Sequence, residues 1–337
     1  MEIKVTTPNR IDLAGGTTDL YPLYLFMDGG CTVNAAITLH SAVTLRPRNR
    51  GDIEIISEDL SERTEASQPQ DLPLDGPLGM IGRAVKVLLP SGGLEIVTAN
   101  QAPAGSGLGA SSALLVALVE GLLLLNDIQE DRHGVIDLAA DIETAQIGVP
   151  TGKQDYIAAA FGGVSVIDFG YRGFVRRTPS IDSGFPEWLE STLVLSYTGE
   201  GRFSGMNNWE VTKAFIDNKD SVREKLIQIR DVARQMGEAI LSRNYDGLPA
   251  LVRREWEIRR TLAPGVSTPR TDSIMNAAGE AGALASKICG AGGGGCMITL
   301  IPSERRSAVE NAIAEAGGRV IPVRIDREGL RVEKSGN

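Results

Sequence analysis

A glycine-rich run at residues 102–113, APAGSGLGASSA, constrains the fold more than any other segment of the sequence. An alternating strand pattern at 94–98 precedes the run and an apolar stretch of helical length at 111–125 follows it, which predicts a strand, a loop and a helix in succession. The run has glycines at alternating positions, namely Gly105, Gly107 and Gly109. Their conformational freedom lets successive backbone N–H groups converge on one point. The helix start adds unpaired N–H groups and the positive end of its dipole, so the loop is suited to bind phosphate.

The residues expected to surround a phosphate are Pro103, Gly105, Ser106, Gly107, Leu108, Gly109, Ala110, Ser111 and Ser112. Of the two serines at the helix start, one can cap the helix and the other can face the phosphate or its Mg²⁺. A tight turn with a capping serine is the alternative. A Walker A loop is excluded because Ala110 stands where that motif has lysine. A dinucleotide fingerprint stays a minor alternative, since Ala110 fits it but no acidic strand end follows about 20 residues later.

Composition narrows the class of protein. With 337 residues, 42% of them hydrophobic and 23% charged, the chain is expected to fold into two lobes. The net charge of −9 argues against a nucleic-acid partner. Cysteines and histidines are too dispersed for a disulfide framework or a zinc site: Cys31, Cys289, Cys296, His40 and His133. The absence of a signal peptide or a spanning stretch predicts a cytoplasmic protein without a membrane partner.

The order of expected elements indicates an α+β protein with lobes at 1–188 and 189–337. The first lobe is predicted to contain strands and helices, with strands at 2–6, 36–46, 53–57, 94–98 and 164–169 and helices at 111–125 and 135–147. The second is predicted to contain a strand at 193–197, amphipathic helices at 210–241 and 248–262, a strand at 297–301, a helix at 304–316 capped by Ser303 and ended by Gly317, and a strand at 319–325. A β-α-β tail suits a sandwich of helices on a sheet.

A second segment, residues 8–19 (PNRIDLAGGTTD), predicts a flexible loop that combines a guanidinium with hydroxyl and carboxylate groups. Arg10 offers a fixed fork for an anion, and Asp19 can accept hydrogen bonds from paired hydroxyls. The loop therefore suits a polyhydroxyl ligand or a phosphoryl group in transfer, and a solvated Asp/Thr/Gly turn is the alternative. The candidate binding residues are Arg10, Gly16, Thr17, Thr18 and Asp19.

A third segment carries two carboxylates on either side of a Gly/Pro turn. Glu143 lies near the end of its predicted helix, and Asp155 lies in the run 148–163, GVPTGKQDYIAAAFGG. Phosphoryl transfer to an alcohol requires a metal ion on the phosphate oxygens and a carboxylate that orients or deprotonates the hydroxyl. Glu143 and Asp155 can fill these roles, whereas a surface glutamate and a helix-capping aspartate are the alternative.

A fourth segment, GAGGGG at 290–295, precedes a strand of the second lobe. Consecutive glycines cost conformational entropy on ordering, so they indicate close approach of the backbone to a ligand or to another loop. We expect Gly292, Gly293 and Gly294 near the site, with a flexible linker as the alternative.

In this order, these segments resemble the motifs of the GHMP kinases, the superfamily of galactokinase, homoserine kinase, mevalonate kinase and phosphomevalonate kinase, over nearly the whole chain. The segments AGGTTD (14–19), GKQDY with AAAFGG (152–163) and GAGGGG (290–295) look most like the D-glycero-D-manno-heptose 7-phosphate kinase branch. The resemblance implies an N-terminal lobe like the second domain of ribosomal protein S5, a ferredoxin-like C-terminal lobe and a site between them. It also implies ATP and Mg²⁺ as cofactors and a hydroxyl of a sugar or sugar phosphate as acceptor.

By position, the resemblance implies that residues 105–112 wrap the ATP phosphates, that Ser111 and Glu143 hold Mg²⁺, and that Asp155 orients or deprotonates the acceptor hydroxyl. Arg10 would stabilise the transferring phosphoryl group, and Asp19 would contact sugar hydroxyls. Many members of the family have serine at the position of Ala110, which leaves open whether Ser111 or Ser112 faces the metal.

The same comparison with the family leaves some alternatives. Galactokinases carry Glu-His where this chain has Gly16-Thr17, which argues against galactose as the acceptor. A kinase or ATP-dependent decarboxylase acting on a mevalonate-type substrate, and a sugar sensor without catalysis, remain as other functions. A sensor would be expected to have lost a metal ligand or the base, whereas Ser111, Glu143 and Asp155 are all present. The sequence leaves the oligomeric state open, a homodimer included.

Overall fold

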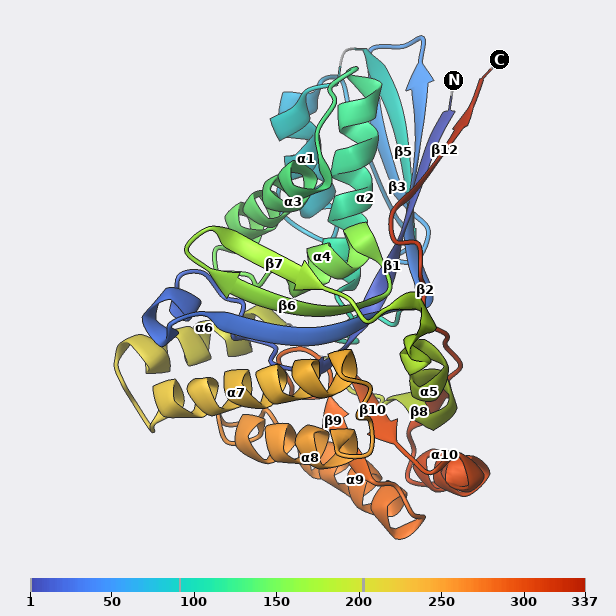
Figure 1. Cartoon of the computed structure of the whole chain (residues 1–337). Coiled ribbons are helices and arrows are strands. Elements are labelled where there is room, and N and C mark those ends of the chain that lie inside the picture. Colours follow the sequence, from blue (N-terminus) through green and yellow to red (C-terminus); the bar gives the residue numbers. More distant parts are fainter. Residues whose placement is uncertain (1, 91, 202–203, 337) are drawn as a thin grey trace.

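Two β-sheets organise the part of the chain that the computed structural model describes, residues 2–90, 92–201 and 204–336 (Figure 1). The larger sheet has eight strands: β1 (Glu2–Ala14), β2 (Gly30–Arg48), β3 (Ile53–Ser57), β4 (Glu62–Ala66), β5 (Gly93–Asn100), β6 (Val164–Gly170), β7 (Gly173–Arg177) and β12 (Arg331–Ser335). Its main path runs β12-β1-β2-β5-β3-β4, and β6 and β7 extend it from β2. The long strand β2 therefore organises the sheet, because it pairs with β1, β5 and β6.

Helices of the first lobe cover one face of the larger sheet (Figure 1). They are α1 (Gly79–Leu88), α2 (Ala110–Leu125), α3 (Arg132–Ile147) and α4 (Gln154–Phe161). Helix α2 is apolar on nearly all sides because it contacts β1 and β2 as well as α1, α3 and α4. This central position directs the first turn of α2 and the loop before it towards the second lobe.

The smaller sheet has the strand order β11-β8-β10-β9 and is antiparallel throughout. Its strands are β8 (Leu193–Tyr197), β9 (Ala285–Ile288), β10 (Cys296–Leu300) and β11 (Arg319–Ile321). Between β8 and β9 the chain forms α6 (Ser204–Ile216), α7 (Val222–Leu241), α8 (Leu248–Arg259) and α9 (Pro269–Glu280), and α10 (Arg306–Glu315) joins β10 to β11. This strand order and connectivity confirm the ferredoxin-like lobe.

Shorter helices connect these elements. They are α5 (Phe185–Thr192) and the 3-10 helices η1 (Leu23–Met27), η2 (Pro69–Asp71), η3 (Ile181–Ser183) and η4 (Ser303–Arg305). The longer helix α7 joins the two lobes. Helix α7 packs against α8 and also against β2 of the larger sheet. The two sheets are thus held together by helices of the second lobe.

Several elements differ from the sequence prediction at their ends. Strand β1 continues to Ala14, so Arg10 lies in a strand and the flexible loop expected from residue 8 was wrong there. The strand continues because nearly every side chain from residue 7 to 14 is buried, which hides the alternation that marks a half-exposed strand. The helix expected at 210–241 is divided at 217–221, where Asn218, Asp220 and Ser221 have positive φ.

The expected helix cap at Ser303 was also wrong. Ser303 begins η4, and the N-cap position of α10 is taken by Arg305 without a side-chain hydrogen bond. The alternative for Asp155, a helix cap, is excluded, since Asp155 lies in the first turn of α4 after the N-cap residue Lys153 and its side chain pairs with Arg10. Strand β4 was missed because most of its side chains are exposed, so its sequence has no apolar alternation.

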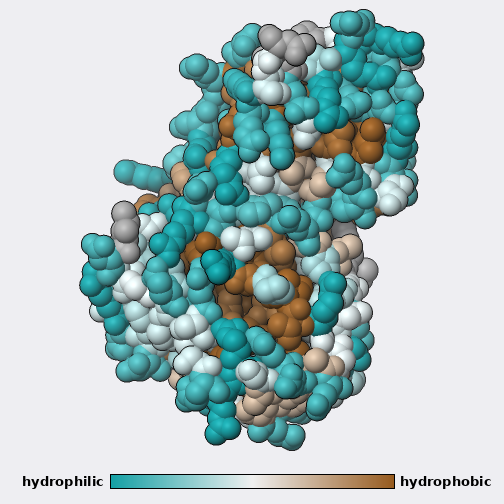
Figure 2. All heavy atoms as spheres, turned by 90° about the vertical axis from the view of Figure 1, so that its right-hand side faces the viewer, coloured by the Kyte–Doolittle hydropathy of each residue, from teal (hydrophilic) through white to brown (hydrophobic). Residues whose placement is uncertain are grey.

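The C-terminal segment returns to the larger sheet. The backbone of Asp326 bonds to Ala36 and Gly163, and β12 then pairs with β1, so both chain ends lie side by side (Figure 1). Seen from the side of β12, α5 and α10, the surface is largely hydrophilic, and hydrophobic residues gather in a hollow of its lower half (Figure 2). None of the helices in the described ranges combines the length and the apolar character that a membrane crossing requires.

Candidate active site

A cavity of about 690 Å³ lies between the two lobes and is lined by parts of three loops. These are the loop 102–109 between β5 and α2, the loop 15–19 after β1, and the glycine loop 290–295 between β9 and β10. The first turns of α2 and α4 and the end of α3 complete the wall. The four segments singled out in the sequence thus meet at one place.

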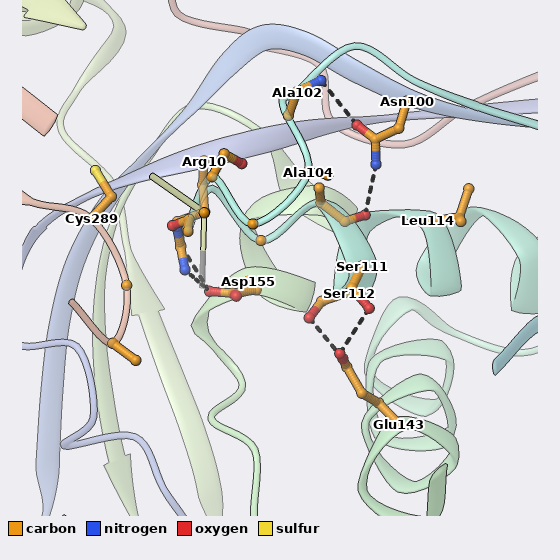
Figure 3. A pocket seen from close by; sticks show the side chains of 18 of the residues that line it. Arg10, Asn100, Ala102, Ala104, Ser111, Ser112, Leu114, Glu143, Asp155 and Cys289 are labelled. Carbon is orange, nitrogen blue, oxygen red and sulfur yellow. Dashed lines mark hydrogen bonds and ion pairs between the residues drawn. The ribbon is translucent and has the colours of Figure 1, made fainter. Parts of the chain in front are cut away.

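Loop 102–109 has the backbone geometry that its glycines permit. Gly105, Gly107 and Gly109 have φ values of +67°, +70° and +72°, in the left-handed region where other residues are strained. Asn100 fixes both ends of the loop, because its Oδ1 accepts from the Ala102 N–H at 3.1 Å and its Nδ2 donates to the Ala110 carbonyl at 3.3 Å (Figure 3). These two bonds hold the loop in shape.

Two of these glycines also allow close contacts. A Cβ on Gly107 would lie 2.6 Å from the carbonyl oxygen of Cys289, and a Cβ on Gly109 would lie 2.9 Å from Cγ of Asp155. Any side chain at either position would displace its neighbour. Glycine here brings loop 102–109 directly against the second lobe and against the carboxylate of α4.

Arg10 connects three parts of the cavity wall. Its Nε and Nη2 each lie 2.7 Å from Oδ1 of Asp155 (Figure 3), and its Nη1 donates to the Gly107 carbonyl at 2.5 Å. Burial lowers the pKa of Arg10, but the negative charges of Asp155 and Asp12 outweigh burial and raise it, so the guanidinium stays charged. A fixed positive charge thus lies beside loop 102–109 and the α4 carboxylate.

Asp155 keeps one carboxylate oxygen accessible. The side chain is 21% exposed, Arg10 holds Oδ1, and among the described residues Oδ2 accepts no hydrogen bond. Burial raises the pKa of Asp155 above its usual value, and the positive charge of Arg10 opposes this rise. A carboxylate with a raised pKa and a free oxygen in a cavity is suited to accept a proton.

Glu143 is a buried carboxylate surrounded by hydroxyl groups. Ser111 Oγ donates to its Oε1 at 2.9 Å and Ser112 Oγ donates to its Oε2 at 2.8 Å (Figure 3). The Tyr156 hydroxyl also donates to Oε2. Burial raises the pKa of Glu143 above its usual value. None of the described Lys or Arg side chains forms an ion pair with it. Hard oxygen ligands around a carboxylate without a cationic partner fit a divalent cation.

A second carboxylate with a shifted pKa lies on loop 15–19. Burial raises the pKa of Asp19 to about 6, although a hydrogen bond from the Gln154 N–H to its Oδ2, at 3.0 Å, opposes the rise. Gly152 leaves room for this carboxylate, because a Cβ there would lie 2.1 Å from Asp19 Oδ2. Asp19 and Asp155 both line the cavity, Asp19 from loop 15–19 and Asp155 from the first turn of α4.

Most residues expected at a site line this cavity. They are Arg10, Gly16, Thr17, Asp19, Pro103, Gly105, Ser106, Gly107, Gly109, Ala110, Ser111, Ser112, Glu143, Asp155, Gly292 and Gly294. Leu108 lies in the hydrophobic core and Gly293 bonds to Val266, so neither lines it. The Thr18 hydroxyl contacts the carbonyls of Gly15 and Cys31 and shapes its own loop.

The structure adds residues that sequence reasoning missed. One end of the cavity is lined by apolar side chains from separate elements, among them Leu60, Pro77, Met80, Ile81 and Leu114. Tyr156 was quoted only as part of a motif, yet its hydroxyl contacts Glu143. No local pattern marks the apolar residues, because they come from α1, α2 and the loops before α1 and share only their tertiary location.

Comparisons with known proteins match both lobes. The family model described as the GHMP kinases N-terminal domain matches residues 79–163, and the GHMP kinases C-terminal model matches residues 236–319. D-glycero-alpha-D-manno-heptose 7-phosphate kinase of Campylobacter jejuni is 28% identical over 335 residues, which cover 98% of each chain. A mevalonate kinase of Thermococcus onnurineus is 26% identical over 352 residues and 99% of each chain.

Solved structures show the same fold. A D-glycero-D-manno-heptose 1-phosphate kinase of Bacteroides thetaiotaomicron superposes with a TM-score of 0.80 at 26% identity, covering 99% of this chain and 100% of the other. A galactokinase of Lactococcus lactis reaches a TM-score of 0.79 at 20% identity, covering 98% of this chain and 95% of the other, and supports the fold alone. The family models, the fold and the cavity agree, and the chain belongs to the GHMP kinases and is an enzyme that transfers a phosphoryl group.

Proposed function

We propose that this enzyme transfers the γ-phosphoryl group of ATP to a hydroxyl of a sugar phosphate, with a heptose 7-phosphate as the expected acceptor. The observation that carries the proposal is Arg10, whose guanidinium contacts both the Gly107 carbonyl and the Asp155 carboxylate in one cavity. A phosphate-binding loop and a proton-accepting carboxylate are thereby held together. The sugar is supported by the heptose 7-phosphate kinase relative, which aligns over 98% of this chain.

On the donor side, the N–H groups of loop 102–109 and the start of α2 receive the ATP phosphates. The apolar end of the cavity, at Met80, Ile81 and Leu114, offers a surface for the flat base of the nucleotide. Arg10 lies between the loop and Asp155, where it can stabilise negative charge on the phosphoryl group as it moves.

Glu143 and Ser111 would hold Mg²⁺, and Ser112 is the alternative hydroxyl ligand. Both serines line the cavity, but Ser111 is the more exposed, which favours it. Bound Mg²⁺ would neutralise charge on the phosphate oxygens. No group of three or more His, Cys, Asp and Glu side chains within the described ranges could hold a metal, so phosphate oxygens of the nucleotide and water would supply the other ligands.

Asp155 acts on the acceptor. Its free Oδ2 accepts the proton of the sugar hydroxyl as the hydroxyl oxygen forms a bond to the γ-phosphorus. The bond from the γ-phosphorus to the bridging oxygen of ADP breaks in the same displacement. Arg10 keeps the carboxylate oriented through Oδ1. The acceptor ring is held by Asp19, Gly16 and Thr17, whose loop faces Asp155 across the cavity.

A mevalonate-type acceptor is the second candidate, because the Thermococcus mevalonate kinase also aligns over 99% of this chain. Mevalonate has a carboxylate and a single primary alcohol, whereas a heptose presents several adjacent hydroxyls. A carboxylate such as Asp19 can accept hydrogen bonds from adjacent hydroxyls, which a heptose presents and mevalonate lacks, and this favours the sugar. The cytoplasm is the compartment we propose.

The test is a screen of ADP release over heptose phosphates, hexoses, hexuronic acids and mevalonate derivatives, with the product identified by phosphorus NMR. We expect ADP release with a heptose 7-phosphate and a new phosphate ester on that sugar. ADP release with mevalonate alone, or formation of CO₂, would replace the sugar with a mevalonate-type substrate. ATP binding without turnover on any alcohol would indicate a sensor.

A further inference from the structure

Four charged side chains from three elements lie buried beneath loop 15–19. Asp12 belongs to β1, Glu255 and Arg259 to α8, and Lys287 to β9, and each is at most 1% exposed. Placing charges in the interior is costly unless they are paired and hydrogen-bonded. Such a group beside a cavity therefore requires a specific reason.

The four side chains form a continuous ion-pair network. Lys287 Nζ lies 3.2 Å from Asp12 Oδ2 and 3.1 Å from Glu255 Oε2. Arg259 Nη2 lies 2.6 Å from Glu255 Oε1. Burial raises the pKa of Glu255, but the charges of Arg259 and Lys287 outweigh burial and hold it below the usual value. The network carries equal numbers of positive and negative charges, and each member has an oppositely charged partner within it.

The network also contacts three consecutive residues of loop 15–19. Arg259 Nη2 donates to the Gly16 carbonyl at 2.6 Å, and its Nη1 donates to Thr17 Oγ1 at 3.3 Å. The Gly15 N–H points at Glu255 Oε1, 3.4 Å away. Gly16 lies directly over Asp12, because a Cβ there would be 2.5 Å from Asp12 Oδ2.

The loop needs such support because its backbone is strained. Thr17 has a φ of +76°, a conformation that is unfavourable for a β-branched residue. Arg259 bonds to the Thr17 hydroxyl and to the carbonyl before it, so it holds both the side chain of the strained residue and the peptide that precedes it. Gly16 and Thr17 line the cavity wall on the acceptor side.

We propose that Arg259, held by Glu255, is a positioning residue that sets the shape of the acceptor pocket through loop 15–19. The inference rests on the proposed function, since it concerns the sugar side of that site. Arg259 itself is buried and reaches the acceptor only through the loop. A network that served only to hold the two lobes together would affect stability without distinguishing between the substrates.

The test compares Arg259→Lys with Val252→Ala, using ATP and D-glycero-D-manno-heptose 7-phosphate. Lysine keeps the positive charge but cannot bond to Glu255, Gly16 and Thr17 at once. We expect the KM of the heptose phosphate to rise about tenfold or more, with the KM of ATP unchanged within about twofold. Val252 is a buried apolar residue of the same helix, so its truncation lowers stability without touching the network, and both KM values should stay near those of the parent.

A second variant avoids the charged residues in case Arg259→Lys does not fold. Gly16→Ala directs a methyl group at Asp12 and Gln154, because the added Cβ would lie 2.5 Å from Asp12 Oδ2 and 3.0 Å from Gln154 Nε2, and the φ of Gly16 does not require glycine. We expect the same selective rise in the KM of the acceptor, and calorimetry without ATP should show weaker heptose phosphate binding. With an active parent enzyme, equal changes in the KM of ATP and the KM of the heptose phosphate would overturn the inference. A lower Tm with both KM values unchanged would also overturn it. An inactive parent would overturn the proposed function itself.

Discussion

The two sides of the cavity are built in different ways. Loop 102–109 connects a strand to the helix that follows it, and its shape comes from its own glycines and from Asn100 close by in the sequence. Loop 15–19 has local bonds at Thr18 but is also held by side chains 240 and 243 residues away, at Glu255 and Arg259. The donor loop also meets the second lobe, where the Cys296 N–H donates to the Ser106 carbonyl at 2.6 Å, but its own glycines set its turns. The acceptor loop is instead bonded to buried charged side chains of the second lobe. Changes at Glu255 or Arg259 can therefore alter acceptor choice and leave the donor side intact.

The largest expected effect on turnover comes from Asp155, which lies between the donor side and the acceptor side of the cavity. Asp155→Asn removes the proton acceptor but keeps its shape, so we expect turnover to fall about 10²–10⁴-fold. The KM of ATP should change little, because Asp155 lies outside loop 102–109. Steady-state rates at saturating ATP and acceptor provide the measurement. Turnover within a few-fold of the parent would remove Asp155 from this role.

Glu143→Gln tests the donor side alone. A neutral amide is a poorer ligand for a hard cation, so the Mg²⁺ concentration needed for half-maximal rate should rise about 10–100-fold. Asp155→Asn is the matched control, since it changes a carboxylate in the same cavity that we do not place on the metal. The same Mg²⁺ dependence in the two variants would contradict the division of roles between Glu143 and Asp155.

Arg10→Lys tests whether the guanidinium acts in the chemical step. Lysine keeps the charge but loses the fork that holds Asp155 Oδ1 and the Gly107 carbonyl together. We expect turnover to fall about tenfold or more, with smaller changes in both KM values. If only the KM of the sugar rises, Arg10 serves ground-state binding instead.

The charged Asp19 carboxylate is expected to strengthen acceptor binding and to lower the free energy of unfolding. Asp19→Ala should chiefly raise the KM of the sugar, and in the parent that KM should rise below pH 6, as the carboxyl with a pKa of about 6 gains a proton. The folded protein binds this proton more tightly than the unfolded chain, whose aspartates titrate near 3.8. Asp19 therefore lowers the free energy of unfolding as pH rises from about 4 to 6, and the loss persists at pH 7.

Asp19→Asn should consequently raise the Tm at pH 7 and have little effect at pH 4. The gain is at most about 3 kcal/mol, since one pKa unit corresponds to about 1.4 kcal/mol. Thermal unfolding at both pH values measures it. A Tm that changes equally at both would show that the charge of Asp19 is not the cause, and a change in the ATP constants alone in Asp19→Ala would place the acceptor elsewhere.

The donor loop could be predicted from the sequence, whereas the support of the acceptor loop could not. Gly105, Gly107 and Gly109 lie in one short run, so their role in a phosphate-binding loop could be predicted before the structure was known. The ferredoxin-like order of the second lobe was likewise predictable from the family resemblance. Asp12, Glu255, Arg259 and Lys287 could not be connected, because each is an ordinary charged residue in its own segment and only the fold buries them together. The apolar end of the cavity was missed for the same reason.

Equilibrium binding to Asp155→Asn tests the central claim most directly, namely that one cavity holds donor and acceptor and that Asp155 serves the transfer between them. The variant is titrated by calorimetry with ATP and, separately, with D-glycero-D-manno-heptose 7-phosphate, and ADP formation is followed in the mixture. Both ligands are expected to bind with Kd values within a few-fold of the parent, while ADP forms at least 10²-fold more slowly. Loss of binding of either ligand, or ADP formation at the parental rate, would contradict the claim.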